Sequence, residues 1–376
     1  MVGTALGEFG AEVIKVEPPG AGDPMRTWGN RRDGIGLVWK SVSRNKRCVT
    51  CDLRQAEGQR LFHDLLDVSD VLVVGNRPSA LERWGIDYES VHAAHPSVVM
   101  LHISGYGRGG PKSDRPGYGT LAEAMSGFAH QTGQEDGPPT LPPFGLADGV
   151  AGISGALAVL MALYHRETSG GSGQVIDLSL IEPLLGILGP GPSVYDQLGI
   201  IAGRHGNRSP NNAPRNAYLT ADDRWVAISA SATSVAERVM RLVGRPDIAE
   251  KPWFASAGER VVRGELIDRA VAKWIHQRKF DEVVEAFQEA GAALAPIYDI
   301  EQLMEDPQIL ARESITTIQD EDLGPLKMQN LFFRMQATPG RIRFGGRRLG
   351  QDNDEVYAGL GLDGAERARL RSQDVV

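Results

Sequence analysis

Asp148 is the side chain whose setting in this sequence best suits chemistry by a carboxylate. It ends a Pro- and Gly-rich stretch, residues 141–148, and a strongly apolar pattern follows it directly. Apolar residues then recur at spacings of three and four, which predicts a buried helix (Val150, Ile153, Leu157, Leu160, Met161 and Tyr164). An aspartate just before a helix lies where backbone N–H groups and the helix dipole favour an anion. The simplest interpretation is a helix N-cap, and the neighbouring residues decide whether the carboxylate also reacts.

Three arginines in the first half of the chain could bind an anionic ligand. Arg26, Arg54 and Arg83 each follow a predicted strand near its carboxyl end. Ligands of open parallel sheets collect at this edge, and the guanidinium fork matches a phosphate group. Each arginine alone is most simply a solvated surface residue. Together they predict a site for a phosphorylated ligand.

Other residues that could suggest chemistry fit structural roles better. Cys48 and Cys51 lie three apart in a predicted strand and therefore face opposite sides, which suits neither a metal nor a disulfide. Glycines at 105–110 are followed by Pro111 rather than by a helix, so a dinucleotide fingerprint fails. His102 lies in an apolar strand and reads as a core histidine. We expect no metal site and no nicotinamide cofactor.

The elements that would position these residues alternate between strands and helices in the first half of the chain. The pattern predicts a helix over 1–9 and another over 56–67, with strands at 13–16, 48–53, 71–74 and 97–104. Such alternation predicts an α/β fold with a parallel sheet. Further along, a strand at 223–229 precedes helical patterns at 233–243, 264–277, 280–290 and 300–306, which predicts a smaller α+β unit.

Length and composition limit the class of protein. The chain has 376 residues, enough for two domains, and a net charge of -8, which argues against a general nucleic-acid binder. Its longest apolar stretch, residues 152–164, is too short to span a bilayer. With only two cysteines and no signal pattern at the start, we expect a cytoplasmic protein without membrane or nucleic-acid partners.

An ordered set of motifs over nearly the whole chain resembles the family III CoA transferases, the superfamily of formyl-CoA and carnitine CoA-transferases. The stretches that carry the likeness are 10–18 with 22–23 and Arg26, 45–47 with 52–53, 70–85, 105–148, 170–177, 349–351 and 360–362. The resemblance implies that Asp148 is the nucleophile, which forms first a mixed anhydride and then an aspartyl-CoA thioester. It also implies CoA contacts at Arg26, Leu53, Arg54, Asn76, Arg77, Arg83 and Tyr118, with Tyr118 shaping the acyl pocket.

The same resemblance implies an architecture. A large Rossmann-like parallel-sheet domain would be formed by both ends of the chain, with a smaller α+β domain inserted and two protomers interlocked as a homodimer. The expected boundaries are 1–188 for the large CoA-binding domain, 189–213 for a linker, 214–313 for the small domain, 314–348 for a return linker and 349–376 for the rest of the large domain. The two linkers would be the crossing segments. The family's first strand and the turn after it have no counterpart in these residues.

The implied activity is transfer of CoA from an acyl-CoA thioester to a carboxylic acid, with no tightly bound cofactor. Two alternatives remain at this stage. One is a 2-methylacyl-CoA racemase of the same superfamily, although Tyr118 stands where racemases carry a histidine base. The other is a non-catalytic acyl-CoA binding protein. In the 189–213 segment, Arg204, His205 and Arg208 would either bind a second carboxylate, which suggests dicarboxylic acids, or form a solvated loop.

Overall fold

The computed structural model describes residues 1–376, which form two compact units. The first unit comprises Met1–Phe128, Pro142–Gly189 and Leu310–Val376, and the second comprises Ala129–Leu141 and Pro190–Ile309. Residues 129–141, which we had grouped with the large domain, therefore cluster with the second unit. Each unit has its own hydrophobic core.

Parallel strands form the centre of the first unit. β1 (Val13–Glu17) pairs with β4 (Lys46–Thr50), and β6 (Val99–Ser104) lies between β5 (Val71–Val74) and β7 (Val175–Ser179). Both sets are parallel, as the alternating pattern predicted. Hydrogen bonds join them as two separate ladders, β1-β4 and β5-β6-β7, and not as one continuous sheet.

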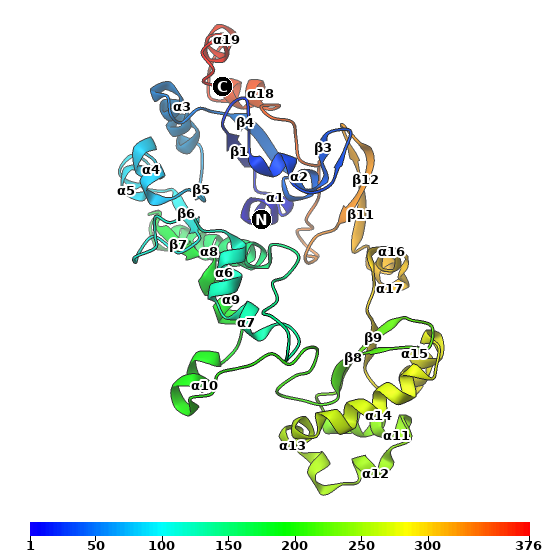
Figure 1. Ribbon diagram of the computed structural model, residues 1–376. Helices are drawn as coiled ribbons and strands as arrows, with labels where there is room; N and C mark the ends of the chain where they lie inside the picture. Colours follow the sequence, from blue (N-terminus) through cyan, green and yellow to red (C-terminus); the bar gives the residue numbers. More distant parts are fainter. The chain divides into compact units, whose positions relative to one another are not determined.

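Helices and short strands complete the first unit (Figure 1). The helices are α1 (Val2–Glu8), η1 (Pro24–Thr27), α2 (Leu37–Val42), α3 (Ala56–Asp67), α4 (Pro78–Trp84), α5 (Tyr88–Ala94), α6 (Gly119–Met125), α8 (Leu146–Ser169), α9 (Ile181–Ile187), α18 (Asn353–Gly359) and α19 (Gly364–Ser372). The remaining strands are β2 (Arg31–Arg32) with β3 (Ile35–Gly36), and β11 (Ile315–Asp320) with β12 (Gly324–Gln329), each pair antiparallel. The C-terminal α18 and α19 pack against β4 and α3 in a shared core, so both ends of the chain build this unit.

α8 is the longest helix and the one that carries Asp148. Its small residues, such as Ala151 and Gly155, are buried because α8 packs closely on β6, β7, α1, α6 and α9. The apolar stretch 152–164, which we expected to be too short to span a bilayer, lies within this 24-residue helix, and the whole helix is long and apolar enough to cross one by length and composition alone. Its opposite face is exposed and apolar in the single chain, where Ile153, Leu157, Leu160, Met161 and Tyr164 are each more than half exposed.

The second unit is an antiparallel sheet covered by helices. β9 (Trp225–Ser229) lies between β8 (Arg215–Leu219) and β10 (Leu294–Pro296). The helices are α10 (Gly191–Leu198), α11 (Thr233–Leu242), α12 (Pro246–Ala249), η2 (Pro252–Ala255), α13 (Ala257–Val262), α14 (Gly264–His276), α15 (Phe280–Glu289) and α16 (Ile300–Glu305). Two more helices, α7 (Phe128–Gln131) and α17 (Pro307–Ala311), lie where the chain passes between units.

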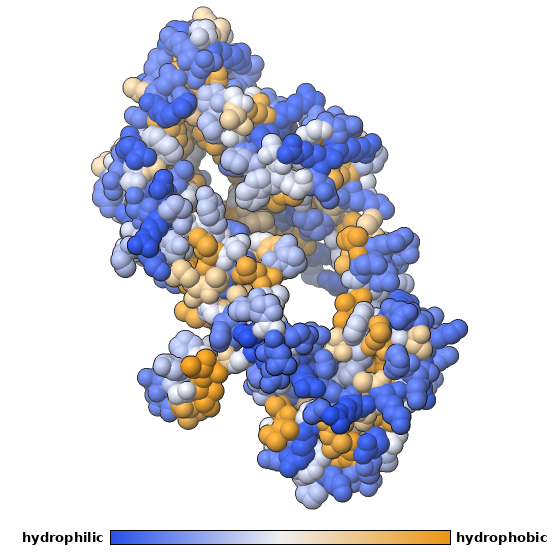
Figure 2. Space-filling model, in the orientation of Figure 1, coloured by the Kyte–Doolittle hydropathy of each residue, from blue (hydrophilic) through white to orange (hydrophobic).

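The structure departs from the sequence patterns mainly in short helices. The segment 189–213, which we expected to be irregular, contains α10, and Leu198, Ile200 and Ile201 at its C-terminal end are exposed; Figure 2 shows a hydrophobic patch in this region. Composition did not predict α10 because the helix begins with Gly191 and Pro192, residue types that also mark loops, although proline is common in the first turn of a helix. α4 was missed for the same reason, since Pro78 is its first residue.

Candidate active site

Asp148 lies in the first turn of α8 and not before it. The N-cap is Gly145, so Asp148 is the third helical residue, and the prediction that it precedes the helix is wrong by one turn. Leu146 and Ala147 are good helix formers and extend the helix toward the N-terminus. The first turn still favours an anion, because the N–H groups there have no partner within the helix.

Two glycines leave the carboxylate of Asp148 uncovered. A Cβ atom on Gly119, the first residue of α6, would lie 2.1 Å from Oδ2 of Asp148, and one on Gly145 would lie 2.9 Å from it. Neither position could hold a side chain without displacing the carboxylate. Asp148 is consequently exposed to solvent in the single chain, although protein atoms crowd one side of it.

The electrostatic surroundings of Asp148 disfavour its charge. Partial burial raises the pKa of the Asp148 carboxyl, and the negative charge of Glu123 raises it further. Glu123 comes from α6, is buried, and accepts a hydrogen bond from the backbone N–H of Ala147 at 3.1 Å. Sequence reasoning missed Glu123. The only signal was an acidic residue among the apolar and small residues of α6.

Tyr118 is brought next to this site because it immediately precedes Gly119 and is the N-cap of α6. Its side chain is 69% exposed. The loop before it folds back on itself, since a Cβ on Gly105 would lie 2.4 Å from Cα of Gly117. The glycine-rich loop thus includes one pair, Gly105 and Gly117, at which two stretches of backbone can cross. Asp177 holds the same loop by accepting the N–H of Arg108 at 3.0 Å.

Arg26 follows β1, and its guanidinium is turned toward the protein. Nε and Nη2 donate to the two carboxylate oxygens of Glu17 at 2.7 Å each, and Nη1 donates to the carbonyl of Arg347 at 2.9 Å. The guanidinium also lies 3.9 Å from the centre of the Trp39 ring. In this structure Arg26 compensates the buried charge of Glu17, and the sequence did not reveal this partnership.

The other predicted CoA contacts follow strands β4 and β5. Arg54 is exposed and donates from Nε and Nη2 to Asp52 at 2.8 and 3.0 Å, while Leu53 beside it is half-buried. After β5, Asn76, Arg77 and Arg83 are all exposed. The structure therefore places these residues in loops or on α4, after the carboxyl ends of parallel strands, as expected for a ligand-binding edge.

His102 supports this edge from the core. It is buried in β6, and its Nε2 lies 2.7 Å from the carbonyl oxygen of Asn76, to which it donates since a carbonyl only accepts. Burial lowers the pKa of its imidazole. The interpretation of His102 as a core histidine is confirmed, and its hydrogen bond fixes the backbone of a predicted CoA contact.

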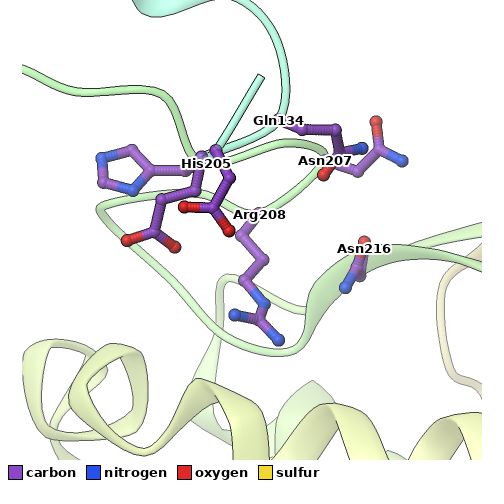
Figure 3. A pocket seen from close by; sticks show the side chains of 7 residues that line it. Gln134, His205, Asn207, Arg208 and Asn216 are labelled. Atoms are coloured by element: carbon purple, nitrogen blue, oxygen red, sulfur yellow. The ribbon is translucent and has the colours of Figure 1, made fainter.

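A polar cavity of about 310 Å³ lies within the second unit (Figure 3). Its lining residues are Gln134, Glu135, Asp136, His205, Asn207, Arg208 and Asn216. Arg208 donates from Nε to the largely buried Asp268 at 2.7 Å, which leaves the amino groups of its fork without a protein partner. Arg204 does not line the cavity and donates instead to the carbonyl of His130 at 3.1 Å. Of the three predicted carboxylate-binding residues, the structure gathers only His205 and Arg208 here.

Comparison with known proteins identifies similar sequences and folds over almost the full chain. The family model "CoA-transferase family III" matches residues 1–353. The chain is 40% identical over 376 residues to succinyl-CoA–D-citramalate CoA-transferase of Chloroflexus aurantiacus, covering 100% of this chain and 93% of that protein. It is 30% identical over 369 residues to succinate–glutarate CoA-transferase of Agrobacterium fabrum, covering 95% and 91%. The crystal structure of a CAIB/BAIF family protein from Brucella suis superposes with a TM-score of 0.82 at 28% identity, covering 96% and 94%.

Proposed function

The chain belongs to CoA-transferase family III, and from that premise we propose that Asp148 carries CoA transfer between a CoA thioester and a carboxylic acid through covalent intermediates. The observation that carries this proposal is the Asp148 carboxylate itself. It is uncovered between two glycines, in the first turn of a helix, with burial and a second carboxylate raising its pKa. A carboxylate whose charge is disfavoured has more to gain from acylation than a fully hydrated one.

The proposed reaction has four steps. An Asp148 oxygen attacks the thioester carbonyl and expels CoA thiolate, which leaves a mixed anhydride. The thiolate then attacks the aspartyl carbonyl and releases the donor acid, which leaves an aspartyl-CoA thioester. The acceptor carboxylate attacks that thioester and expels the thiolate again, forming a second anhydride. Attack by the thiolate on the acceptor carbonyl completes the transfer and regenerates the Asp148 carboxylate.

The first turn of α8 supports this chemistry. Each tetrahedral intermediate places negative charge on an oxygen derived from a carbonyl, and preorganised N–H donors stabilise such an oxyanion. At the start of α8 the N–H groups of Leu146, Ala147 and Gly149 already have partners, so the backbone N–H of Asp148 and the peptide beside Gly119 are the donors that we propose for the oxyanion. CoA must stay bound between steps. We propose that Arg54, Arg77 and Arg83, whose side chains are exposed beyond β4 and β5, hold its phosphates.

We further propose dicarboxylic acids as the acid substrates. The relatives named above act, by their names, on succinyl-CoA with D-citramalate and on succinate with glutarate. Within the second unit, the cavity that Arg208 and His205 line also carries Glu135 and Asp136, which oppose the binding of an anion there.

Trapping of the covalent enzyme tests the proposed mechanism. The purified protein is incubated with succinyl-CoA, treated with borohydride or hydroxylamine, and its intact mass and peptide map are measured. A product at Asp148 is expected in the wild type and none in Asp148→Asn. The same substitution should slow exchange of labelled succinate into succinyl-CoA by roughly 10³-fold or more. Undiminished exchange in Asp148→Asn would refute the covalent role.

We also propose that the protein is a homodimer whose protomers interlock. The supporting observation is the exposed apolar face of α8, defined by Ile153, Leu157, Leu160, Met161 and Tyr164, because soluble monomers rarely expose contiguous apolar patches of this kind. Leu160→Glu should reduce the dimer fraction in light scattering. Interlocked chains should stay dimeric on dilution to nanomolar concentration, whereas a docked dimer would dissociate. Recovery of the protein only from membranes would assign the face of α8 to lipid instead.

A further inference from the structure

Glu123 is a buried acid at the start of the nucleophile's helix. It lies on α6 with 2% of its surface exposed, and it accepts the N–H of Ala147, the residue that directly precedes Asp148, at 3.1 Å. Its environment is the apolar cluster where α6, α8 and α9 meet, built from Ala122, Ala147, Ala151, Leu180 and Leu184. Burying a carboxylate is costly unless it is paired, yet the hydrogen-bond partner here is a backbone N–H and not a cation. A glutamine could accept the same hydrogen bond without this cost.

We propose that Glu123 is a positioning residue for Asp148, which fixes the first turn of α8 through Ala147 and keeps a second negative charge beside the nucleophile. This inference rests on the proposed covalent role of Asp148. It assigns two separable functions to one side chain. The hydrogen bond sets where the Asp148 backbone lies, and the charge sets how stable the free Asp148 carboxylate is.

The charge matters because Asp148 changes its own charge during turnover. The free side chain is an anion, whereas the mixed anhydride and the aspartyl-CoA thioester are neutral at that position. A neighbouring carboxylate destabilises the anion and has much less effect on the neutral acyl forms, so it shifts the equilibrium toward the covalent enzyme. The raised pKa of the Asp148 carboxyl, which burial and then Glu123 cause, is consistent with this arrangement.

Other charges around this junction are few. The amino group of Met1 would favour the ionised form of Asp148, but burial lowers the pKa of that amino group to about 5, so it carries little charge near neutral pH. Glu182 lies on α9, which packs against both α6 and α8, and its Oε2 accepts a hydrogen bond from the hydroxyl of Ser179 at 2.8 Å. Glu182 is therefore a carboxylate in the same unit with a local partner of its own, and it provides a matched control.

Three variants separate the two functions of Glu123. Glu123→Gln keeps an oxygen that accepts the Ala147 N–H and removes the charge. Glu123→Ala removes both, and Glu182→Gln removes a nearby charge that we do not assign to Asp148. For each we would measure the pH profile of kcat/KM for succinyl-CoA with labelled succinate, the titration of the Asp148 carboxyl by isotope-edited infrared spectroscopy, and the fraction of enzyme trapped by hydroxylamine.

In Glu123→Gln we expect the Asp148 carboxyl to titrate at lower pH, the acid limb of kcat/KM to move the same way, and the trapped fraction to fall. Glu123→Ala should also lose about 10- to 100-fold in kcat, because the nucleophile is misplaced. Glu182→Gln should match the wild type. If Glu123→Gln titrates like the wild type and traps as much covalent enzyme, the inference is overturned. The covalent role of Asp148 would still stand if Asp148→Asn were inactive, so the two failures are distinguishable.

Discussion

Gly119→Ala is the substitution that most directly tests the geometry around Asp148. The added Cβ would start 2.1 Å from Oδ2 of Asp148, and real Cβ contacts essentially never fall below 3.0 Å. The carboxylate must therefore move by about 0.9 Å or rotate away from the site. Misplacing a reacting group by about 1 Å costs on the order of 10²-fold in rate, because the attacking atom no longer meets the carbonyl at a productive angle.

We expect Gly119→Ala to lower kcat for succinyl-CoA exchange by about 100-fold, with a matching loss of hydroxylamine-trapped enzyme. Gly149→Ala is the matched control, because nothing lies within 4 Å of the Cβ it would add, one residue after Asp148. Alanine is also the better helix former, so Gly149→Ala should leave thermal stability unchanged or slightly raised. Retention of wild-type kcat by Gly119→Ala, with both variants folded, would refute the claim that this glycine keeps the nucleophile free.

Three further predictions concern pH and the arginines. Partial burial and Glu123 raise the pKa of the Asp148 carboxyl, so the acid limb of the kcat/KM profile should have its midpoint at a higher pH than that of an ordinary aspartate. A midpoint within or below the usual aspartate range would contradict this expectation. Glu17→Gln leaves the guanidinium of Arg26 without an opposing charge, although only 15% of the Arg26 side chain is exposed. Chemical denaturation should therefore show that the free energy of unfolding falls by about 3–5 kcal/mol. A change within experimental error would mean that the ion pair contributes nothing to stability. Arg54→Ala should raise KM for the CoA thioester, and an unchanged KM would remove Arg54 from the CoA site. A lower melting temperature should accompany the change, because Arg54 is also the main partner of the buried Asp52.

Local sequence patterns determined the elements of this protein well where one face of an element is buried. The apolar residues at spacings of three and four after Asp148 belong to α8, and the apolar runs around residues 71–74 and 97–104 are β5 and β6. The strand patterns could be recognised because β5 and β6 bury most of their apolar side chains. In α8 the expectation of a buried large-residue face is wrong, because the buried face consists mainly of small residues such as Ala151 and Gly155 and the large apolar residues are exposed in the single chain. The family also followed from the sequence, since its motifs occur in order along the chain.

Helix boundaries and short helices were less predictable. α8 begins one turn earlier than its apolar pattern, and α4 and α10 open on Pro or Gly and were not expected. Proline and glycine mark loops as well as helix starts, so composition alone cannot distinguish the two. Packing against neighbouring elements makes that choice.

The sequence by itself singled out Asp148 as the residue that we propose to be the nucleophile, together with the strand ends at which we propose that a phosphorylated ligand binds. Only the tertiary structure showed that Gly119 and Glu123 lie beside Asp148, and that Glu17 occupies the guanidinium of Arg26. Neighbours within one element follow from its period, and these can be read along the chain. Contacts between α6 and α8, or between a loop and β1, depend on how the elements pack, and no local sequence pattern determines which residues of two different elements come into contact.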